Sequence, residues 1–264
     1  MIRYLRLMGA FARVSAQQEL AYRANFAIGL LHSALSLATG VASLWIVFGQ
    51  IERLQGWDFT SALALLGVYL TLSALNRLVI GASLDALAGL MGDIWTGRFD
   101  FTLLRPANIQ FLVSFRQWRF LALVDAALGL GVLGVAAARL GAALTLARLA
   151  AFALALAAST ATFYAVLLLF ASLVFWSPGF LFTWLFNNLW QLARWPLGLY
   201  PGWLRLMLTW VVPLGLMTTL PTQALMGALR PGMMLAALGL AAALTLVASA
   251  LFRVGLRRYS SASS

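Results

Sequence analysis

Long uninterrupted apolar runs are the feature that most limits what this chain can fold into. Residues 24–49 and 232–252 contain no Asp, Glu, Lys or Arg and exceed the roughly 20 residues that a helix needs to cross about 30 Å of hydrocarbon. Several further runs share this character, and the alternating pattern of an outer-membrane barrel is absent. The first run begins too late and is too long for a cleavable signal peptide, so we expect the N-terminus to be retained. The sequence predicts an all-α, polytopic membrane protein.

The net charge of +11 indicates membrane topology rather than a nucleic-acid partner, because most basic residues flank apolar runs. All 18 basic residues are arginines. The absence of lysine excludes a nucleotide-binding P-loop, and the absence of cysteine excludes disulfides and cysteine metal sites. His32, the only histidine, lies in an apolar run and lacks partners for a metal. We therefore expect no catalytic residue, metal or cofactor in this chain.

The apolar runs predict one transmembrane domain, 1–264, with six spans. The predicted spans are 25–49, 60–80, 119–138, 149–174, 179–194 and 232–252. Placing both termini in the cytoplasm puts most arginines at cytoplasmic segments, as the positive-inside rule requires. A seven-span alternative, in which the segment before the last span crosses completely, would place the C-terminal arginines outside.

Residues 1–23 are predicted to form an amphipathic helix in the membrane interface rather than a span. At 100° per residue, Arg3, Arg6 and Arg13 share one face with Gln17. The opposite face carries Tyr4, Met8, Phe11 and Ala12. A basic face opposite an apolar one is typical of helices that lie on the membrane surface.

Two other segments interrupt the pattern of spans. Residues 85–116 form the longest polar stretch and are expected in the cytoplasm. Residues 195–224 are apolar but contain prolines that preclude one continuous helix: Pro196, Pro201, Pro213 and Pro221. Irregular backbone at membrane depth is tolerated only inside protein or beside water. We therefore predict a hairpin that enters from the outer side and returns, with an amphipathic loop on the outer leaflet as the alternative.

Asp125 is the one acidic residue that falls well inside a predicted span. A carboxylate at that depth is a candidate proton relay or a partner for a cationic substrate. An ion pair or hydrogen bond with a neighbouring helix explains it equally well.

Four stretches of the chain together resemble a known family. They are ELAYRANF at 19–26, DIWTGRFDFTLLRPANIQF at 93–111, RWPLGLYPGWLRLMLTWVVPLGLMTTLPTQALMG at 194–227 and LFRVGLRRYSSASS at 251–264. In this order, they are similar to those of type 2 ABC exporter permeases, in a little-characterised six-span branch. The resemblance runs nearly end to end.

The resemblance implies a role for each segment. The N-terminal helix would be the connecting helix, and 85–116 would hold a coupling helix that docks on an ATPase subunit. The expected docking residues are Asp93, Ile94, Trp95, Arg98, Phe99, Arg105 and Pro106. Residues 195–224 would cap the translocation path, to which we assign Asp125, Trp195, Tyr200, Pro213 and Pro221.

The resemblance also implies partners and a location. Two ABC ATPase subunits would bind ATP and Mg²⁺, and a second permease chain, identical or a sister, would complete the path within membrane lipid. The location would be a bacterial plasma membrane, and the direction export. A proton-coupled secondary transporter using Asp125 is the alternative function, although such transporters usually show matching broken helices in two halves.

Overall fold

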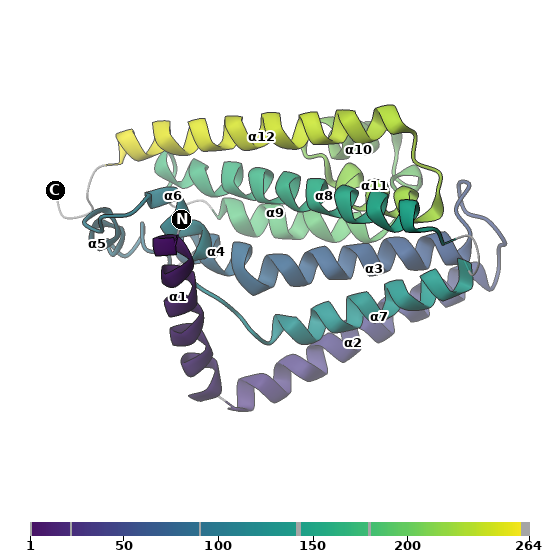
Figure 1. The fold of residues 1–264 in the computed structure, drawn as a ribbon, viewed down its shortest axis with the longest axis horizontal. Coiled ribbons are helices and arrows are strands. Elements are labelled where there is room, and N and C mark those ends of the chain that lie inside the picture. Colours follow the sequence, from purple (N-terminus) through teal and green to yellow (C-terminus); the bar gives the residue numbers. More distant parts are fainter. Residues whose placement is uncertain (1, 22, 90, 141–143, 179–180, 260–264) are drawn as a thin grey trace.

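Long helices run side by side along one axis, and both termini lie at the same end of the bundle (Figure 1). The computed structural model describes residues 2–21, 23–89, 91–140, 144–178 and 181–259, with only the backbone described at 2, 20–21 and 23–25. Within these residues there is no strand, and Leu54 and Trp57 form an isolated β-bridge. The predicted all-α fold is confirmed.

Five helical segments are long and apolar enough to cross a membrane. They are Phe26–Phe48 within α2 (Arg23–Phe48), Phe59–Ala88, α7 (Ala122–Leu140), Leu146–Phe175 and α12 (Pro231–Arg258). The second comprises α3 (Phe59–Leu75), the π-helical turn η1 (Asn76–Ile80) and α4 (Gly81–Ala88), and the fourth comprises α8 (Leu146–Ser172) and η3 (Leu173–Phe175). A sixth candidate is a pair of helices, Gly202–Val211 and Leu214–Met226, bent by 84°.

Shorter helices complete the described chain. They are α1 (Ile2–Ala21), α5 (Phe99–Leu103), α6 (Ile109–Phe115), α9 (Phe182–Trp190), η4 (Gln191–Arg194), η5 (Leu197–Leu199), α10 (Gly202–Leu206), η6 (Met207–Val211) and α11 (Leu214–Met226). Helix α1 runs across the bundle axis rather than along it (Figure 1). Its half-buried side includes Met8, Phe11 and Ala12, whereas Arg6 and Arg13 are exposed.

Local sequence signals explain where several helices begin. The side chains of Asp58, Asn108 and Thr145 each accept a hydrogen bond from a backbone N–H three residues later, as N-caps do. Pro231 occupies the first turn of α12, where its missing N–H is not needed. Helix α11 ends at Gly227, whose φ of 73° favours glycine.

The region of the predicted fifth span, 179–194, contains a shorter element than expected. Residues 179 and 180 lie outside the described residues, and the nine residues of α9 plus the four of η4 would rise only about 20 Å. Pro196 follows and cannot donate the next helical hydrogen bond. The described part of this segment therefore consists of two short helices rather than one continuous helix over 179–194.

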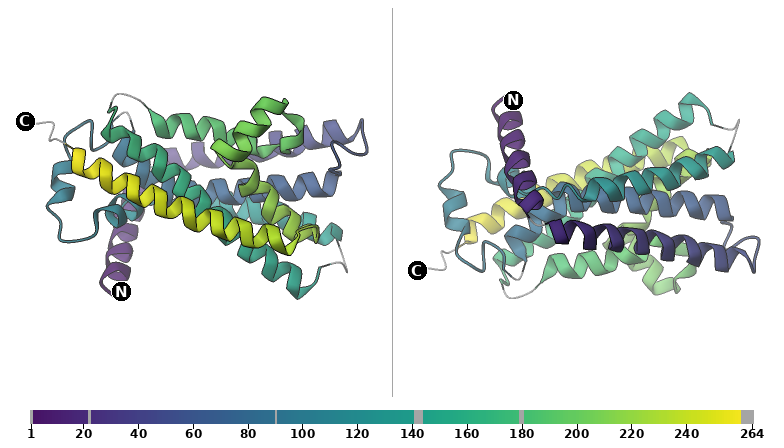
Figure 2. Two further views of the ribbon diagram at one scale, coloured as in Figure 1. Left: turned by 90° about the horizontal axis from the view of Figure 1, so that it is seen from above. Right: turned by 90° about the horizontal axis from the view of Figure 1, so that it is seen from below.

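The segment after η4 begins and ends at the same end of the bundle. A Cβ added at Gly198 would lie 3.2 Å from that of Gln55, in the connection between α2 and α3. A Cβ at Gly227 would lie 2.5 Å from Nε of Arg148, near the start of α8. Between these points, α10 and α11 fold back across the bundle, as the view from above shows (Figure 2). This geometry agrees with a re-entrant hairpin.

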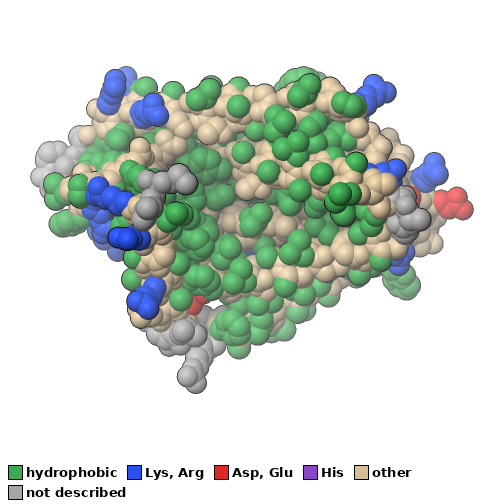
Figure 3. Space-filling view, in the orientation of Figure 1, with side chains coloured by type: hydrophobic (Ala, Val, Ile, Leu, Met, Phe, Trp, Pro, Cys, Tyr) green, Lys and Arg blue, Asp and Glu red, His purple; other side chains and the backbone are tan. Residues whose placement is uncertain are grey.

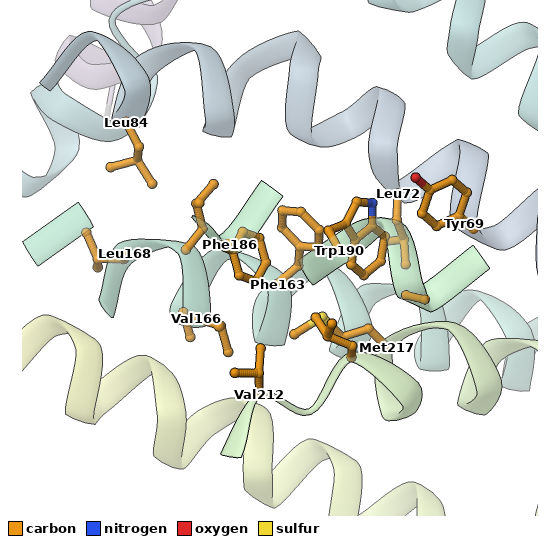
Figure 4. Close-up of a cluster of buried hydrophobic side chains, with 14 of the residues drawn as sticks. Tyr69, Leu72, Leu84, Phe163, Val166, Leu168, Phe186, Trp190, Val212 and Met217 are labelled. Atoms are coloured by element: carbon orange, nitrogen blue, oxygen red, sulfur yellow. The ribbon is translucent and has the colours of Figure 1, made fainter. Parts of the chain in front are cut away.

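Aromatic side chains from α3, α8 and α9 form the centre of the core (Figure 4). The ring of Trp190 stacks on Tyr69 with centroids 5.3 Å apart and meets Phe163 edge-on at 4.6 Å. Phe163 also meets Phe186 edge-on at 5.2 Å. These contacts hold the short helix α9 against the two long helices.

Glycines allow α3 and α7 to touch through their backbones. A Cβ added at Gly129 would lie 2.8 Å from the backbone nitrogen of Thr71, and one at Gly67 would lie 3.0 Å from that of Leu133. Because lipid tails are as apolar as the side chains, close packing of this kind replaces the hydrophobic effect as the force between spans.

The surface between the ends of the bundle suits a membrane. On the face shown in Figure 3, arginine side chains lie at the two ends, and the surface between them is largely hydrophobic. The protein is therefore a multi-pass membrane protein.

Gly129→Ala is expected to lower the free energy of unfolding by roughly 1–3 kcal/mol, because the new methyl group overlaps the α3 backbone. Gly131→Ala is the matched control: it lies on the same helix, and nothing lies within 4 Å of its added Cβ. Thermal denaturation in mild detergent, followed by size-exclusion chromatography, measures both. Equal stability of the two variants would contradict the close contact.

Candidate functional site

Large apolar side chains are exposed at the end of the bundle that carries both termini. Trp95, Phe101 and Leu104 are 56%, 69% and 81% exposed, and Met91 is also exposed. Arg98 and Arg105, which are also exposed, lie on the same segment. We call these six residues the end surface. Such a mixture of aromatic groups and arginines is typical of the centres of protein interfaces.

The predicted docking residues divide between this surface and the core. Trp95, Arg98, Arg105 and Pro106 are exposed, whereas Asp93, Ile94 and Phe99 are buried. Phe99 is 0% exposed, so it is not available as an anchor for a partner. Its ring packs against Tyr259 after α12 and Phe175 in η3, with centroids 5.0 and 5.9 Å apart. Phe101, two residues along, takes the exposed position.

Asp93 fixes the turn that leads into α5. Its carboxylate lies 2.5 Å from the Arg116 guanidinium and 3.6 Å from that of Arg98. Its backbone carbonyl accepts a hydrogen bond from the N–H of Phe99. Asp93 therefore supports the end surface from inside rather than contacting a partner itself.

Helix α6 connects the same segment to the long helices. Gln110 donates hydrogen bonds to the hydroxyl groups of Tyr164 in α8 and Ser249 in α12, at 3.1 and 2.9 Å. Ser114 is 2.9 Å from the same Tyr164 oxygen. Through α6, the segment that carries the end surface is thus hydrogen-bonded to α8 and α12.

Helix α1 packs along the connection between α5 and α7. The ring of Tyr4 meets that of Phe111 edge-on at 4.7 Å. The Glu19 carboxylate accepts hydrogen bonds from the backbone N–H groups of Phe120 and Leu121, just before α7 begins. The N–H of Arg119 in turn donates to the carbonyl of Leu78 in η1.

A second candidate site is a polar cavity of about 380 Å³ among α2, the α3–α4 span, α9 and η4. Polar and charged side chains from all of these helices, and Arg119 from the connection before α7, line it: His32, Ser36, Ser73, Asn76, Arg77, Asp85, Arg119, Asn187, Gln191 and Arg194. The aromatic side chains of Tyr69 and Trp190 line it as well. An intramembrane cavity with polar groups converging on it is a candidate binding site.

The π-helical turn η1 presents Asn76 and Arg77 to this cavity. Its extra residue re-aims the side chains of the helix, and such turns are frequent at functional sites. Arg77 lies 3.2 Å from Asp125, which is buried in α7. This pairing favours the ion-pair explanation of Asp125 over a free proton-relay carboxylate.

Trp190 and Arg194 line the cavity and contact α3. The indole N–H of Trp190 donates a 2.8 Å hydrogen bond to Ser73. The guanidinium carbon of Arg194 lies 5.5 Å from the centroid of the Tyr69 ring, a cation–π contact. Together, these contacts join α9 and η4 to α3.

None of the residues that we assigned to the path lines this cavity within the described chain. Asp125 lies behind Arg77, which lines the cavity. Trp195, Tyr200, Pro213 and Pro221 belong to the re-entrant segment, where the Tyr200 hydroxyl donates to the Leu192 carbonyl at 2.8 Å. A sequence signal for the cavity does exist: Asn187, Gln191 and Arg194 recur at helical spacing in an otherwise apolar segment.

Asp125→Asn is expected to lower the free energy of unfolding by roughly 1–3 kcal/mol, because it leaves Arg77 without its counter-ion. The loss should fall below that of a fully buried pair because the Arg77 side chain is 38% exposed. Adding Arg77→Gln should restore at least part of the stability. Thermal denaturation of both single variants and the double variant measures the coupling. Losses that simply add would contradict a structural ion pair.

Comparison with known families identifies the chain. Residues 34–263 match the family described as ABC-2 family transporter protein. Comparison with curated proteins and with solved structures gives no match. The family match covers most of the chain and agrees with the helical, multi-pass architecture. The chain therefore belongs to the ABC-2 transporter family and is a permease component of an ABC transporter.

Proposed function

We propose that this chain is the membrane-spanning subunit of an ATP-driven exporter. Two copies of a separate ABC ATPase would bind ATP and Mg²⁺, and a second permease chain, identical or a sister, would complete the path. The single observation that carries the proposal is the end surface. Its exposed Trp95, Phe101 and Leu104 lie on the segment that the family resemblance identifies as the ATPase-docking element.

The composition of the end surface supports an ATPase as its partner. Aromatic side chains and arginines carry most of the binding free energy at protein interfaces, whereas scattered surface charges contribute little. A contiguous exposed apolar patch in water is unfavourable unless a partner covers it. The end surface combines large apolar groups with Arg98 and Arg105, which suits a groove with acidic groups at its rim.

The contacts between the end-surface segment and the long helices support a role in transmitting movement from an ATPase to the membrane. Phe99 packs against the ends of α8 and α12, and Gln110 is hydrogen-bonded to both helices. A displacement of the docked segment would therefore move long helices as rigid bodies, which is how such transitions propagate. ATP-driven closure of the two ATPase subunits would supply that displacement.

The polar cavity is proposed as part of the translocation path. It lies among α2, α3 and α9 within a single chain, and a second permease chain would enclose it further. We place both termini and the end surface in the cytoplasm of a bacterium and the re-entrant hairpin on the outer side of its plasma membrane. Export as the direction follows the resemblance to type 2 ABC exporter permeases.

Affinity purification of the tagged chain in mild detergent, from the cell that makes it, tests the proposal. Mass spectrometry should find a P-loop ATPase, and a variant with Trp95→Ala and Phe101→Ala should recover at least about tenfold less of it, since such anchors often contribute 2 kcal/mol or more each. Both side chains are exposed, so the variant should stay folded.

A second double variant, Trp203→Ala with Trp210→Ala, is the matched control. Both tryptophans are exposed, and they belong to α10 and η6 in the re-entrant segment. It should retain the ATPase. Absence of any ATPase from the folded wild-type sample, or equal loss in both double variants, would contradict docking at the end surface.

A further inference from the structure

The charges that line the polar cavity do not balance. Three arginines, Arg77, Arg119 and Arg194, line it against one aspartate, Asp85. Arg77 is paired with Asp125 behind the wall. Asp85 lies near the side chains of Thr183 and Arg119. The positive charge that no carboxylate offsets is that of Arg194.

Arg194 has unused hydrogen-bonding capacity. Its Nε is buried and has no hydrogen-bond acceptor among the residues that the structure describes. A guanidinium carries five N–H donors in a planar fork that fits carboxylate and phosphate groups, and a buried donor without an acceptor is costly. The Tyr69 ring lies 5.5 Å from the guanidinium carbon and offers no acceptor atom to this Nε–H group.

Helix α2 borders the same cavity, and the neighbouring side chains of Leu31 and Leu35 on this helix are apolar and exposed. His32 and Ser36 of α2 form one wall, and α2 is mostly exposed along its length. The rings of Tyr69 and Trp190 form another wall. A ligand could therefore place a charged group near Arg194 while an apolar tail passes beside α2 into lipid.

We propose that this cavity binds the anionic headgroup of an amphiphile, a phosphate or carboxylate carried on an apolar tail, and that Arg194 is its main charge partner. The inference deepens the proposed function, because it names the class of substrate that the path would accept. A cationic substrate, which Asp125 would suit if its charge were free, is disfavoured because that carboxylate is already paired with Arg77.

Equilibrium binding to the full chain in nanodiscs of phosphatidylcholine tests the inference without any ATPase. Radiolabelled dodecyl phosphate is the probe, and empty nanodiscs give the background. Competitors with the same tail are dodecylphosphocholine and dodecyltrimethylammonium. We expect dodecyl phosphate to bind at least about tenfold more tightly than either competitor. Inorganic phosphate, which lacks the tail, should compete far more weakly.

Three variants assign the site. Arg194→Gln should weaken binding of dodecyl phosphate by about tenfold, whereas Arg194→Lys should weaken it less, because the charge remains although the planar fork is lost. Arg205→Gln, which removes an exposed arginine from α10, should bind as the wild type does. A melting temperature for each variant shows that it is folded, and Arg194→Lys keeps the test informative if Arg194→Gln is unstable.

Several outcomes would overturn the inference. Equal binding of the three amphiphiles, a preference for the cation, or an unchanged affinity in Arg194→Gln would exclude an anionic site at Arg194. Competition by inorganic phosphate as strong as that by dodecyl phosphate would exclude an amphiphile. If the ATPase co-purifies and the preference is absent, only the substrate class fails. If no ATPase co-purifies, the proposed function fails whatever the binding result.

Discussion

Backbone contact between α3 and α7 is the interaction on which the polar centre of this protein depends. The two helices are antiparallel, so the contacts of Gly67 with Leu133 and of Gly129 with Thr71 continue in register to Arg77 and Asp125. A charged side chain within the membrane needs a partner nearby, and the close approach of these helices supplies one. With Arg77 neutralised, the π-helical turn can face an open cavity. The ion pair therefore depends on the glycine contacts, and the cavity in turn depends on the ion pair.

Contacts also link the two candidate sites along the bundle. The end surface is attached through Phe99 and Gln110 to α8 and α12, which enclose the core beside α9. A second set of contacts starts at α1, where Glu19 accepts a hydrogen bond from the backbone N–H of Phe120, just before α7. The neighbouring Arg119 donates its backbone N–H to Leu78 in η1, and Arg119 also lines the polar cavity. Two routes therefore run from the proposed docking surface to the polar cavity. Each consists of packed or hydrogen-bonded groups, so a shift at one end has a physical means of reaching the other.

The sequence predicts the long spans well because each needs only a run of apolar residues, a local property. It predicts α9 poorly, since its length depends on Pro196 and on aromatic contacts with α3 and α8. The docking segment shows a similar limit: Phe99 and Phe101 are chemically identical, and only the tertiary contacts with Tyr259 and Phe175 determine which one is buried. Asp125 could not be assigned for the same reason, because its partner lies 48 residues away in sequence, on another helix. Asn187, Gln191 and Arg194, by contrast, recur at helical spacing, which is a local property of the sequence that indicates a polar helix face at the cavity.

The central claim is that the polar cavity belongs to a path whose access changes with the state of an ATPase. Because the chain contains no cysteine, Ser36→Cys would introduce a single reactive thiol at the cavity wall. Its labelling by a membrane-impermeant maleimide can be measured from each side, in right-side-out and inverted membrane vesicles, with and without ATP. The account predicts that ATP lowers labelling from the cytoplasmic side and raises it from the outer side. Labelling that is unaffected by ATP from both sides, in vesicles where the ATPase is present and active, would contradict it.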